Sequence, residues 1–330
     1  MSTLAPLLQA FFTDRLVGQR QASPHTVASY RDTWCLLLRF AHQRTGHSPH
    51  EMAIEEIDAP LVGAFLDHLE TERGASTRTR NLRLTAIRSL FQFAAFCHPE
   101  QAAMIQRVLA IPPKRTRKSL VTYLAEDEMD ALLAAPDRDR WIGRRDHALL
   151  LLALETGLRV SELTSLTCAD IRLGVGAHVH CMGKGRKERI TPLRRETKII
   201  LQAWFDERAG GPNDALFPGP RGARLSRDGV RRLVERHVRA ASRSCPSLAT
   251  KHVTPHTLRH SCAMRMRRHG IDLATIALWL GHEDVRTTHG TYLHADLALK
   301  EQALDRTAPP NTQPGRFRPN DELLAFLEGL

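Results

Sequence analysis

Six residues in four separated segments of the chain have side chains suited to phosphoryl transfer. Two are arginines, two are histidines, and a lysine and a tyrosine complete the set. In any one segment the signal is weak, because an arginine after a glycine, or a lysine in a Gly-Lys-Gly turn, usually has a structural role. The six residues are Arg159, Lys184, His256, Arg259, His282 and Tyr292.

Taken together, these residue types predict a metal-free phosphodiester site. Transfer at a phosphodiester places charge on the non-bridging oxygens, which a pair of arginines such as Arg159 and Arg259 can bind. A tyrosine hydroxyl has an ordinary pKa of about 10, so Tyr292 needs a cationic pocket or a neighbouring base to attack at neutral pH. Histidines suit that proton transfer, and Lys184 can protonate the departing 5′ oxygen. We therefore expect Tyr292 to be the nucleophile.

Residues 1–111 predict helices throughout. Ser23 followed by Pro24 is typical of a capped helix start, and further helices are expected over 60–69 and from Ser76. The helix from Ser76 carries four arginines with no acid between them, and the apolar positions among them would face a core. The arginine face is a candidate DNA contact, although a merely solvated face fits the same pattern. The arginines are Arg78, Arg80, Arg83 and Arg88, and the apolar positions are Leu82, Leu84, Ile87 and Leu90.

Residues 112–119 predict a basic linker between two domains. They read Pro-Pro-Lys-Arg-Thr-Arg-Lys-Ser, and a segment with two prolines and four cations cannot form a packed core. Its charge makes it a candidate strap across a phosphate backbone, and the alternative is a flexible tether. The four cations are Lys114, Arg115, Arg117 and Lys118.

Residues 120–305 predict a larger domain with both helices and strands. An apolar helix over 145–155 should end at Gly157, and Ser161 should cap the next helix. Alternation over 177–182 and 188–193 predicts a β-hairpin with Lys184 at its turn. A helix from about residue 227 would place two further candidate DNA contacts, Arg232 and Arg236, on its outer face.

The last segment, 306–330, predicts a tail. It is rich in proline and asparagine from Pro309 and ends in a short apolar helix over 321–327. A helix this short gains little stability alone, so we expect its apolar face to dock on another surface.

The composition favours a nucleic acid as partner. A formal charge of +11 over 330 residues points to an anionic partner, and arginine binds phosphate through paired hydrogen bonds. No apolar run is long enough to cross a bilayer, and no signal peptide is visible. The six cysteines are scattered, which suits a reducing cytoplasm.

The spaced set that ends in Leu-Gly-His282 and Tyr292 resembles the tyrosine recombinase family, the Xer and phage-integrase enzymes, over most of residues 20–300. The resemblance implies a mainly α fold with a small β-sheet, in which an all-helical, SAM-like core-binding domain precedes an α+β catalytic domain. It also implies a C-shaped clamp on double-stranded DNA, and a site-specific recombinase or integrase of a kind found on mobile genetic elements.

The same resemblance implies a role for each site residue. Arg159 and Arg259 would clamp the scissile phosphate, and Tyr292 would attack to give a 3′-phosphotyrosine. Lys184 would be the general acid, His256 would assist proton transfer, His282 would support the phosphate and Glu162 would orient the site. Because the covalent link stores the bond energy, no cofactor or metal is implied. Strand exchange would pass through a Holliday junction in a tetramer, with a second recombinase as an optional partner.

Three alternatives remain open. Tyr292 follows His282 by ten residues, one more than is usual in the family, and one extra helical residue rotates a side chain by about 100°. A catalytically impaired, sequence-specific DNA-binding protein of the same fold is therefore one alternative, and a type IB topoisomerase-like enzyme is another. A third is a metal site on His252, His256 and His260, which are spaced four apart, although Pro255 would interrupt their helix.

Overall fold

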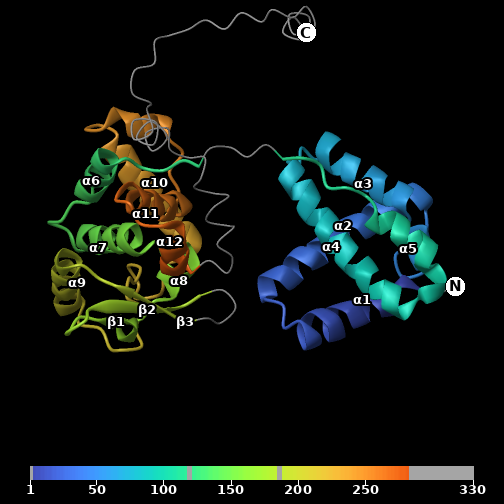
Figure 1. Cartoon of the computed structure of the whole chain (residues 1–330), viewed down its shortest axis with the longest axis horizontal. Coiled ribbons are helices and arrows are strands. Elements are labelled where there is room, and N and C mark those ends of the chain that lie inside the picture. The colour runs from blue at the N-terminus through green and yellow to red at the C-terminus, as the bar shows by residue number, and fades with distance from the viewer. Residues whose placement is uncertain (1–2, 117–120, 184–187, 282–330) are drawn as a thin grey trace, which may run out of the picture. The chain divides into compact units, whose positions relative to one another are not determined.

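The computed structural model describes residues 3–116, 121–183 and 188–281. The chain divides into two compact units, Met1–Lys118 and Ser119–Leu330 (Figure 1). The first is helical and the second combines helices with a three-stranded sheet. The expected fold class, mainly α with a small sheet, is confirmed. Within the described ranges, no helix is long and apolar enough to span a membrane.

Helices packed around one apolar core form the first unit. Ser23 accepts a hydrogen bond from the backbone N–H of Thr26 and Ser76 accepts one from Thr79, so both predicted helix starts are confirmed. Large side chains such as Trp34 fill the core. The helices are α1 (Leu4–Ala10), which continues in wider π-type turns over Phe11–Gln19, α2 (Pro24–Thr45), α3 (Ala59–Thr71), α4 (Thr77–Cys97) and α5 (Ala102–Leu109).

The predicted faces of α4 are wrong at two positions. Arg80 is buried and donates hydrogen bonds to the carbonyl of Pro112 and to the side chain of Asn81. Leu82, which was expected in the core, is 60% exposed. The helical repeat explains both, because positions four and seven residues after Arg80 are the buried Leu84 and Ile87. Arg80 is therefore a structural residue of this unit and does not lie on an outer face.

The start of the predicted linker lies against the helical unit. Lys114 exchanges two hydrogen bonds with Asn81 through its backbone, and its ammonium lies 2.5 Å from Glu70. Arg115 is exposed, and Arg117 and Lys118 lie outside the described residues. The described start of the linker is therefore held against the helical unit at Lys114 and is not a free strap there.

In the second unit, helices precede and follow the three strands along the chain. Its sheet is antiparallel in the order β1-β2-β3, which confirms the predicted hairpin strands. The sheet lies at the end of the unit away from α6 (Figure 1). The elements are α6 (Glu126–Ala134), α7 (Trp141–Thr156), α8 (Val160–Ser165), β1 (Ile171–Arg172), β2 (His178–Met182), β3 (Glu188–Pro192), α9 (Arg195–Arg208), α10 (Arg227–Ala241), α11 (Pro255–Arg268) and α12 (Leu273–Leu280).

The turn between α7 and α8 differs in one respect from its prediction. Gly157 ends α7 in the left-handed region at φ 61°, as expected. The N-cap of α8 is Arg159, and Ser161 lies inside the helix, so its predicted capping role is wrong. The Glu162 side chain satisfies the first backbone N–H instead, because it accepts a 2.8 Å hydrogen bond from the nitrogen of Arg159.

Candidate active site

Arg159 and Glu162 form the first half of the site. Glu162 Oε1 accepts a 2.8 Å hydrogen bond from Arg159 Nη1, while Oε2 accepts the one from the Arg159 backbone. The Glu162 side chain is 4% exposed and that of Arg159 is 26% exposed. The buried carboxylate therefore fixes the orientation of the guanidinium, and part of the Arg159 side chain remains accessible to a ligand.

Arg259 forms the second half, from the first two turns of α11. It is buried, and its guanidinium donates to two carbonyls from distant parts of the chain. Nη1 lies 2.6 Å from the oxygen of Gly157 and Nη2 lies 2.7 Å from that of Leu280. Arg159 Nη2 donates to the next carbonyl, that of Gly281, at 3.2 Å. The end of α12 thus fixes both arginines, although 100 residues separate them in the sequence.

Two glycines permit this close packing. A Cβ atom on Gly157 would lie 2.6 Å from Cδ2 of Leu280, and one on Gly281 would lie 2.9 Å from Nη1 of Arg189. Both glycines have positive φ, 61° and 63°. A larger residue at either position would be strained at this φ and would displace the end of the Leu280 or Arg189 side chain that packs there.

His256 lies on the first turn of α11 and is exposed. A surface hollow of about 400 Å³ extends beside it, lined also by Val160 and by the cations Arg227 and Arg231. Val160 directly follows Arg159, so the hollow borders the arginine site. Arg227 and Arg231 were not among the predicted contacts, and the signal for them is their position in the first turns of α10, next to the predicted Arg232.

His260 packs edge-on against His256, with 5.3 Å between the ring centroids. Burial, together with the nearby His256 and Arg259, lowers the pKa of His260 to about 4. His260 is therefore neutral at neutral pH. His252 precedes α11, which begins at Pro255. Within the described ranges, no three His, Cys, Asp or Glu residues are grouped as metal ligands would be.

Arg189 is a site residue that the sequence analysis missed. It lies on β3, its side chain is 10% exposed, and its Nη2 donates to Glu162 Oε2 at 3.0 Å. The signal is an inverted strand pattern, since Ile190 is 64% exposed while Arg189 and Thr191 point inward. A charge on the inward face of a short strand indicates a buried partner.

Three of the six candidate residues, Lys184, His282 and Tyr292, lie outside the described residues. Described residues next to two of the undescribed segments nevertheless lie at the site. Arg189 lies two residues after the end of the 184–187 segment, and Gly281 directly precedes His282. Both contact the Arg159–Glu162 pair or its immediate support.

The remaining predicted DNA contacts differ in their availability. Arg78 and Arg232 are exposed, and Arg88 is half-buried. Arg83 is engaged by the carbonyl of Ser29 and the hydroxyl of Thr33. Arg236 is 58% exposed, and one of its nitrogens lies 2.5 Å from the buried Asp146.

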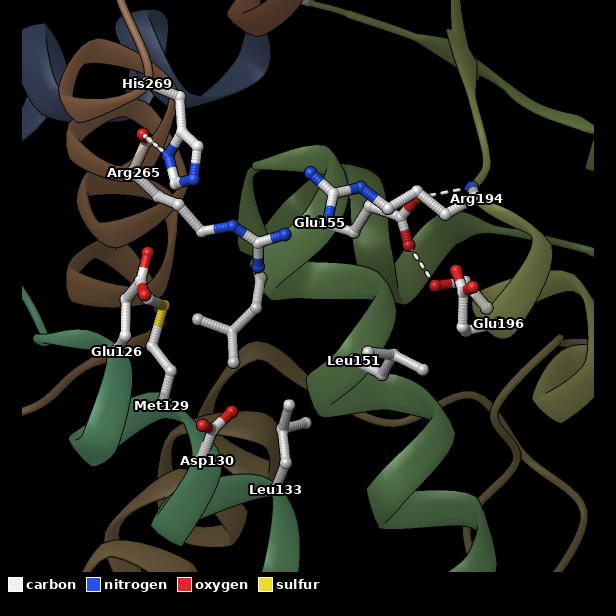
Figure 2. Close-up of a pocket in the computed structure, with 12 residues that line it drawn as sticks. Glu126, Met129, Asp130, Leu133, Leu151, Glu155, Arg194, Glu196, Arg265 and His269 are labelled. Atoms are coloured by element: carbon white, nitrogen blue, oxygen red, sulfur yellow. Dashed lines mark hydrogen bonds between the residues drawn. The ribbon is translucent and has the colours of Figure 1, made fainter.

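A separate pocket of about 420 Å³ lies between α6, α7, α9 and α11 (Figure 2). Arg265 projects into it from α11 and Arg194 crosses it from the opposite side, beside Glu155 (Figure 2). Glu155 accepts hydrogen bonds from the Arg194 backbone and from the Thr197 hydroxyl. Arg159, His256 and Arg259, the three candidates that the structure describes, are not among the described residues that line this pocket.

Comparison with known proteins gives the class of this chain. The phage integrase family model matches residues 122–298, and the phage integrase N-terminal SAM-like domain matches residues 10–96. A putative integrase/recombinase, y4rC of Sinorhizobium fredii, is 55% identical over 329 residues, which cover 100% of this chain and 99% of that protein. Tyrosine recombinase XerC of Pelobacter propionicus is 35% identical over 318 residues, covering 94% and 99%.

A solved structure shares the fold. The XerH site-specific recombinase bound to palindromic difH substrate, in a post-cleavage complex, aligns with a TM-score of 0.68 at 24% identity, covering 87% of this chain and 82% of that one. The chain belongs to the phage integrase family. Its members are tyrosine recombinases, enzymes of site-specific DNA recombination.

Proposed function

We propose that this chain cleaves and rejoins double-stranded DNA at a specific site, with Tyr292 as the nucleophile. The observation that carries the proposal is the fixed pair of guanidinium groups, Arg159 and Arg259, attached to the consecutive carbonyls of Gly281 and Leu280. Preorganised donors of this kind stabilise charge that develops on a phosphodiester without reorganising during the reaction. Their attachment next to residue 282 supports a role for His282 beside the same phosphate.

The proposed reaction balances without an external energy source. The Tyr292 oxygen attacks the scissile phosphorus, a 3′-phosphotyrosine bond forms and the bond to the 5′ oxygen breaks. Lys184 protonates that departing oxygen, and His256 assists proton transfer. A 5′ hydroxyl of a second strand then reverses the step and releases the tyrosine. No cofactor enters the scheme, because the phosphotyrosine conserves the energy of the broken bond.

We assign roles to the segments on the same basis. Residues 1–111 would be the core-binding domain, 112–119 the linker, 120–305 the catalytic domain and 306–330 the tail. Four protomers would assemble on paired sites and exchange strands through a Holliday junction, optionally with a second recombinase. The net charge of +11 suits binding to the phosphate backbone of DNA. The protein would act in the cytoplasm.

The test is a cleavage assay on a site recovered by binding selection from genomic DNA. The recovered duplex is nicked so that cleavage traps the covalent complex, and the adduct is mapped by mass spectrometry. A 3′-phosphotyrosyl adduct at Tyr292, formed equally well in EDTA, is the expected result. Loss of cleavage in EDTA would favour a metal on the histidines instead.

The spacing of His282 and Tyr292 gives one competing function. Tyr292 lies ten residues after His282 instead of the family's usual nine, which favours a DNA-binding protein without cleavage. That function predicts tight, selective binding and no adduct. The same assay separates the two functions, since binding and cleavage are measured on one duplex. Relaxation of supercoiled plasmid without site preference would instead mark a type IB topoisomerase-like enzyme.

A further inference from the structure

Arg189 and Arg159 share one buried carboxylate. Glu162 Oε1 accepts from Arg159 Nη1 at 2.8 Å, and Glu162 Oε2 accepts from Arg189 Nη2 at 3.0 Å. The two arginines reach it from different elements, the turn before α8 and strand β3. Glu162 is therefore held from both sides, and its orientation sets that of Arg159.

Burial makes this arrangement costly to disturb. The Arg189 side chain is nine-tenths buried, and its Nε and Nη1 atoms find no hydrogen-bond acceptor among the described residues. Glu162 is thus the partner that compensates the Arg189 charge. Removal of one partner from a buried ion pair is strongly destabilising, because the other charge is left buried without compensation.

The charge balance matters as much as the geometry. One carboxylate that served Arg159 alone would neutralise it and weaken its attraction for an anionic phosphate. Because the carboxylate is divided between two guanidiniums, the group of three keeps a net positive charge. Burial raises the pKa of the neighbouring Cys181 thiol, a shift that the Arg189 charge opposes, so the thiol adds no negative charge at neutral pH.

The position of Arg189 also joins two ends of the site. Arg189 packs closely against Gly281, since a Cβ atom at Gly281 would lie only 2.9 Å from Nη1 of Arg189. The carbonyl of Gly281 accepts the hydrogen bond from Arg159. In the strand register Arg189 lies opposite Cys181 and follows the 184–187 segment by two positions. One side chain thus contacts the support of Arg159 and belongs to the hairpin that carries Lys184.

We infer that Arg189 is a positioning residue for Arg159, acting through the shared Glu162 carboxylate to hold its guanidinium in place and leave it net positive charge. This inference rests on the proposed phosphate-binding role of Arg159. It assigns Arg189 no contact with DNA, because its side chain is buried.

The experiment is a double-mutant cycle in the full-length protein with Arg189→Gln, Glu162→Gln and the combination. Each variant is measured for the single-turnover cleavage rate on the trapping duplex, for Kd on the same duplex, and for its unfolding midpoint. Arg189→Gln should slow cleavage by about 10- to 100-fold, the range for residues that orient a functional group at one remove. Its Kd should stay within about threefold, because many other cations contact the backbone.

Coupling identifies the route of the effect. In the Glu162→Gln background, Arg189→Gln should change the rate by less than about threefold, since the shared carboxylate is already gone. Arg189→Lys, which keeps the charge, should recover part of the rate. The matched control is Arg144→Gln, which removes an arginine paired with Glu207 at 2.6 Å elsewhere in the same unit and should leave the cleavage rate unchanged.

Several results would overturn the inference. Additive effects in the cycle, or parallel losses of affinity and rate, would make Arg189 a folding residue or a DNA contact. If Arg189→Gln does not fold, Arg189→Lys in both backgrounds gives the same coupling. If the unaltered enzyme forms no adduct, the proposed function fails, and the ¹⁵N side-chain signal of Arg159 then decides. That signal should shift in Arg189→Gln and not in Arg144→Gln, and an unchanged signal refutes positioning.

Discussion

Arg159 and Arg259 donate to consecutive carbonyl groups, those of Gly281 and Leu280, at 3.2 and 2.7 Å. The end of α12 therefore fixes the separation of the two guanidiniums before any DNA is bound. Because residue 282 follows directly, a change in this turn should be transmitted to the arginines and to His282 together. Preorganisation of this kind contributes to catalysis by removing reorganisation from the reaction step.

Arg159→Ala should slow covalent complex formation by at least about 10²- to 10³-fold, the usual effect of losing one preorganised donor. Affinity for the duplex should fall much less, because the other cations that we expect to contact the backbone remain. Arg259→Ala should have a similar effect on the rate and should also lower the unfolding midpoint, since that side chain is buried. Single-turnover cleavage and gel-shift titration measure both quantities. Equal losses of binding and rate would make these arginines ordinary phosphate anchors.

Tyr292→Phe should bind the selected site as tightly as the unaltered protein and form no covalent adduct, because only the attacking oxygen is removed. Denaturing gels of the trapped complex measure this directly. Tyr123→Phe is the matched control, since the Tyr123 hydroxyl accepts a hydrogen bond from Arg268 at 3.1 Å and has no assigned role in cleavage. An adduct that persists in Tyr292→Phe, or that maps to Tyr30 or Tyr123, contradicts the assignment.

Gly157→Ala should lower the free energy of unfolding by about 1–3 kcal/mol, because alanine is strained at φ 61° and its Cβ would meet Leu280. The comparison is Gly176→Ala, whose φ of 69° is equally positive but whose Cβ would have no atom within 4 Å. Chemical denaturation of both variants separates backbone strain from the contact. Equal destabilisation would show that the approach of Leu280 is unimportant.

DNA affinity should fall steeply with salt, with log K against log [salt] sloping by roughly −0.9 for each phosphate neutralised. Replacing Lys114, Arg115, Arg117 and Lys118 together with Ser should flatten the slope if the linker contacts the backbone. Among single changes, Arg115→Ser should have the larger effect, because Lys114 is paired with Glu70. Titrations at several salt concentrations give the slopes. An unchanged slope in the fourfold variant leaves the segment a tether.

Truncation after Ala308 should leave binding to a single site nearly intact and weaken cooperative filling of paired sites. The helix predicted over 321–327 is too short to be stable alone, so its apolar face should dock on another surface. The resemblance to the tyrosine recombinases implies that this surface belongs to a neighbouring protomer. The tail lies outside the described residues, so the solution measurement decides. A gel-shift titration on a two-site duplex is the assay, and unchanged cooperativity would mean that the tail docks on its own domain or has no role.

Local features were predictable because short-range contacts determine them. Ser23 and Ser76 accept hydrogen bonds from residues three positions on, so their caps are legible in the sequence. The hairpin strands follow from alternation, and Gly157 as the end of α7 follows from its freedom at positive φ. The candidate residues Arg159 and Arg259 were predicted from residue type and spacing, since few side chains suit a phosphodiester without a metal.

Only the tertiary structure decided those features that depend on a partner distant in the chain. Arg80 was expected on a surface, and its burial depends on the Pro112 carbonyl 32 residues later in the chain. Ser161 was expected to cap α8, but the cap is Arg159, whose backbone Glu162 satisfies. Arg189 gave no signal by motif, because its partner Glu162 lies 27 residues earlier on another element. A buried charge is stable only where folding brings a compensating group to it, and local sequence does not encode that meeting.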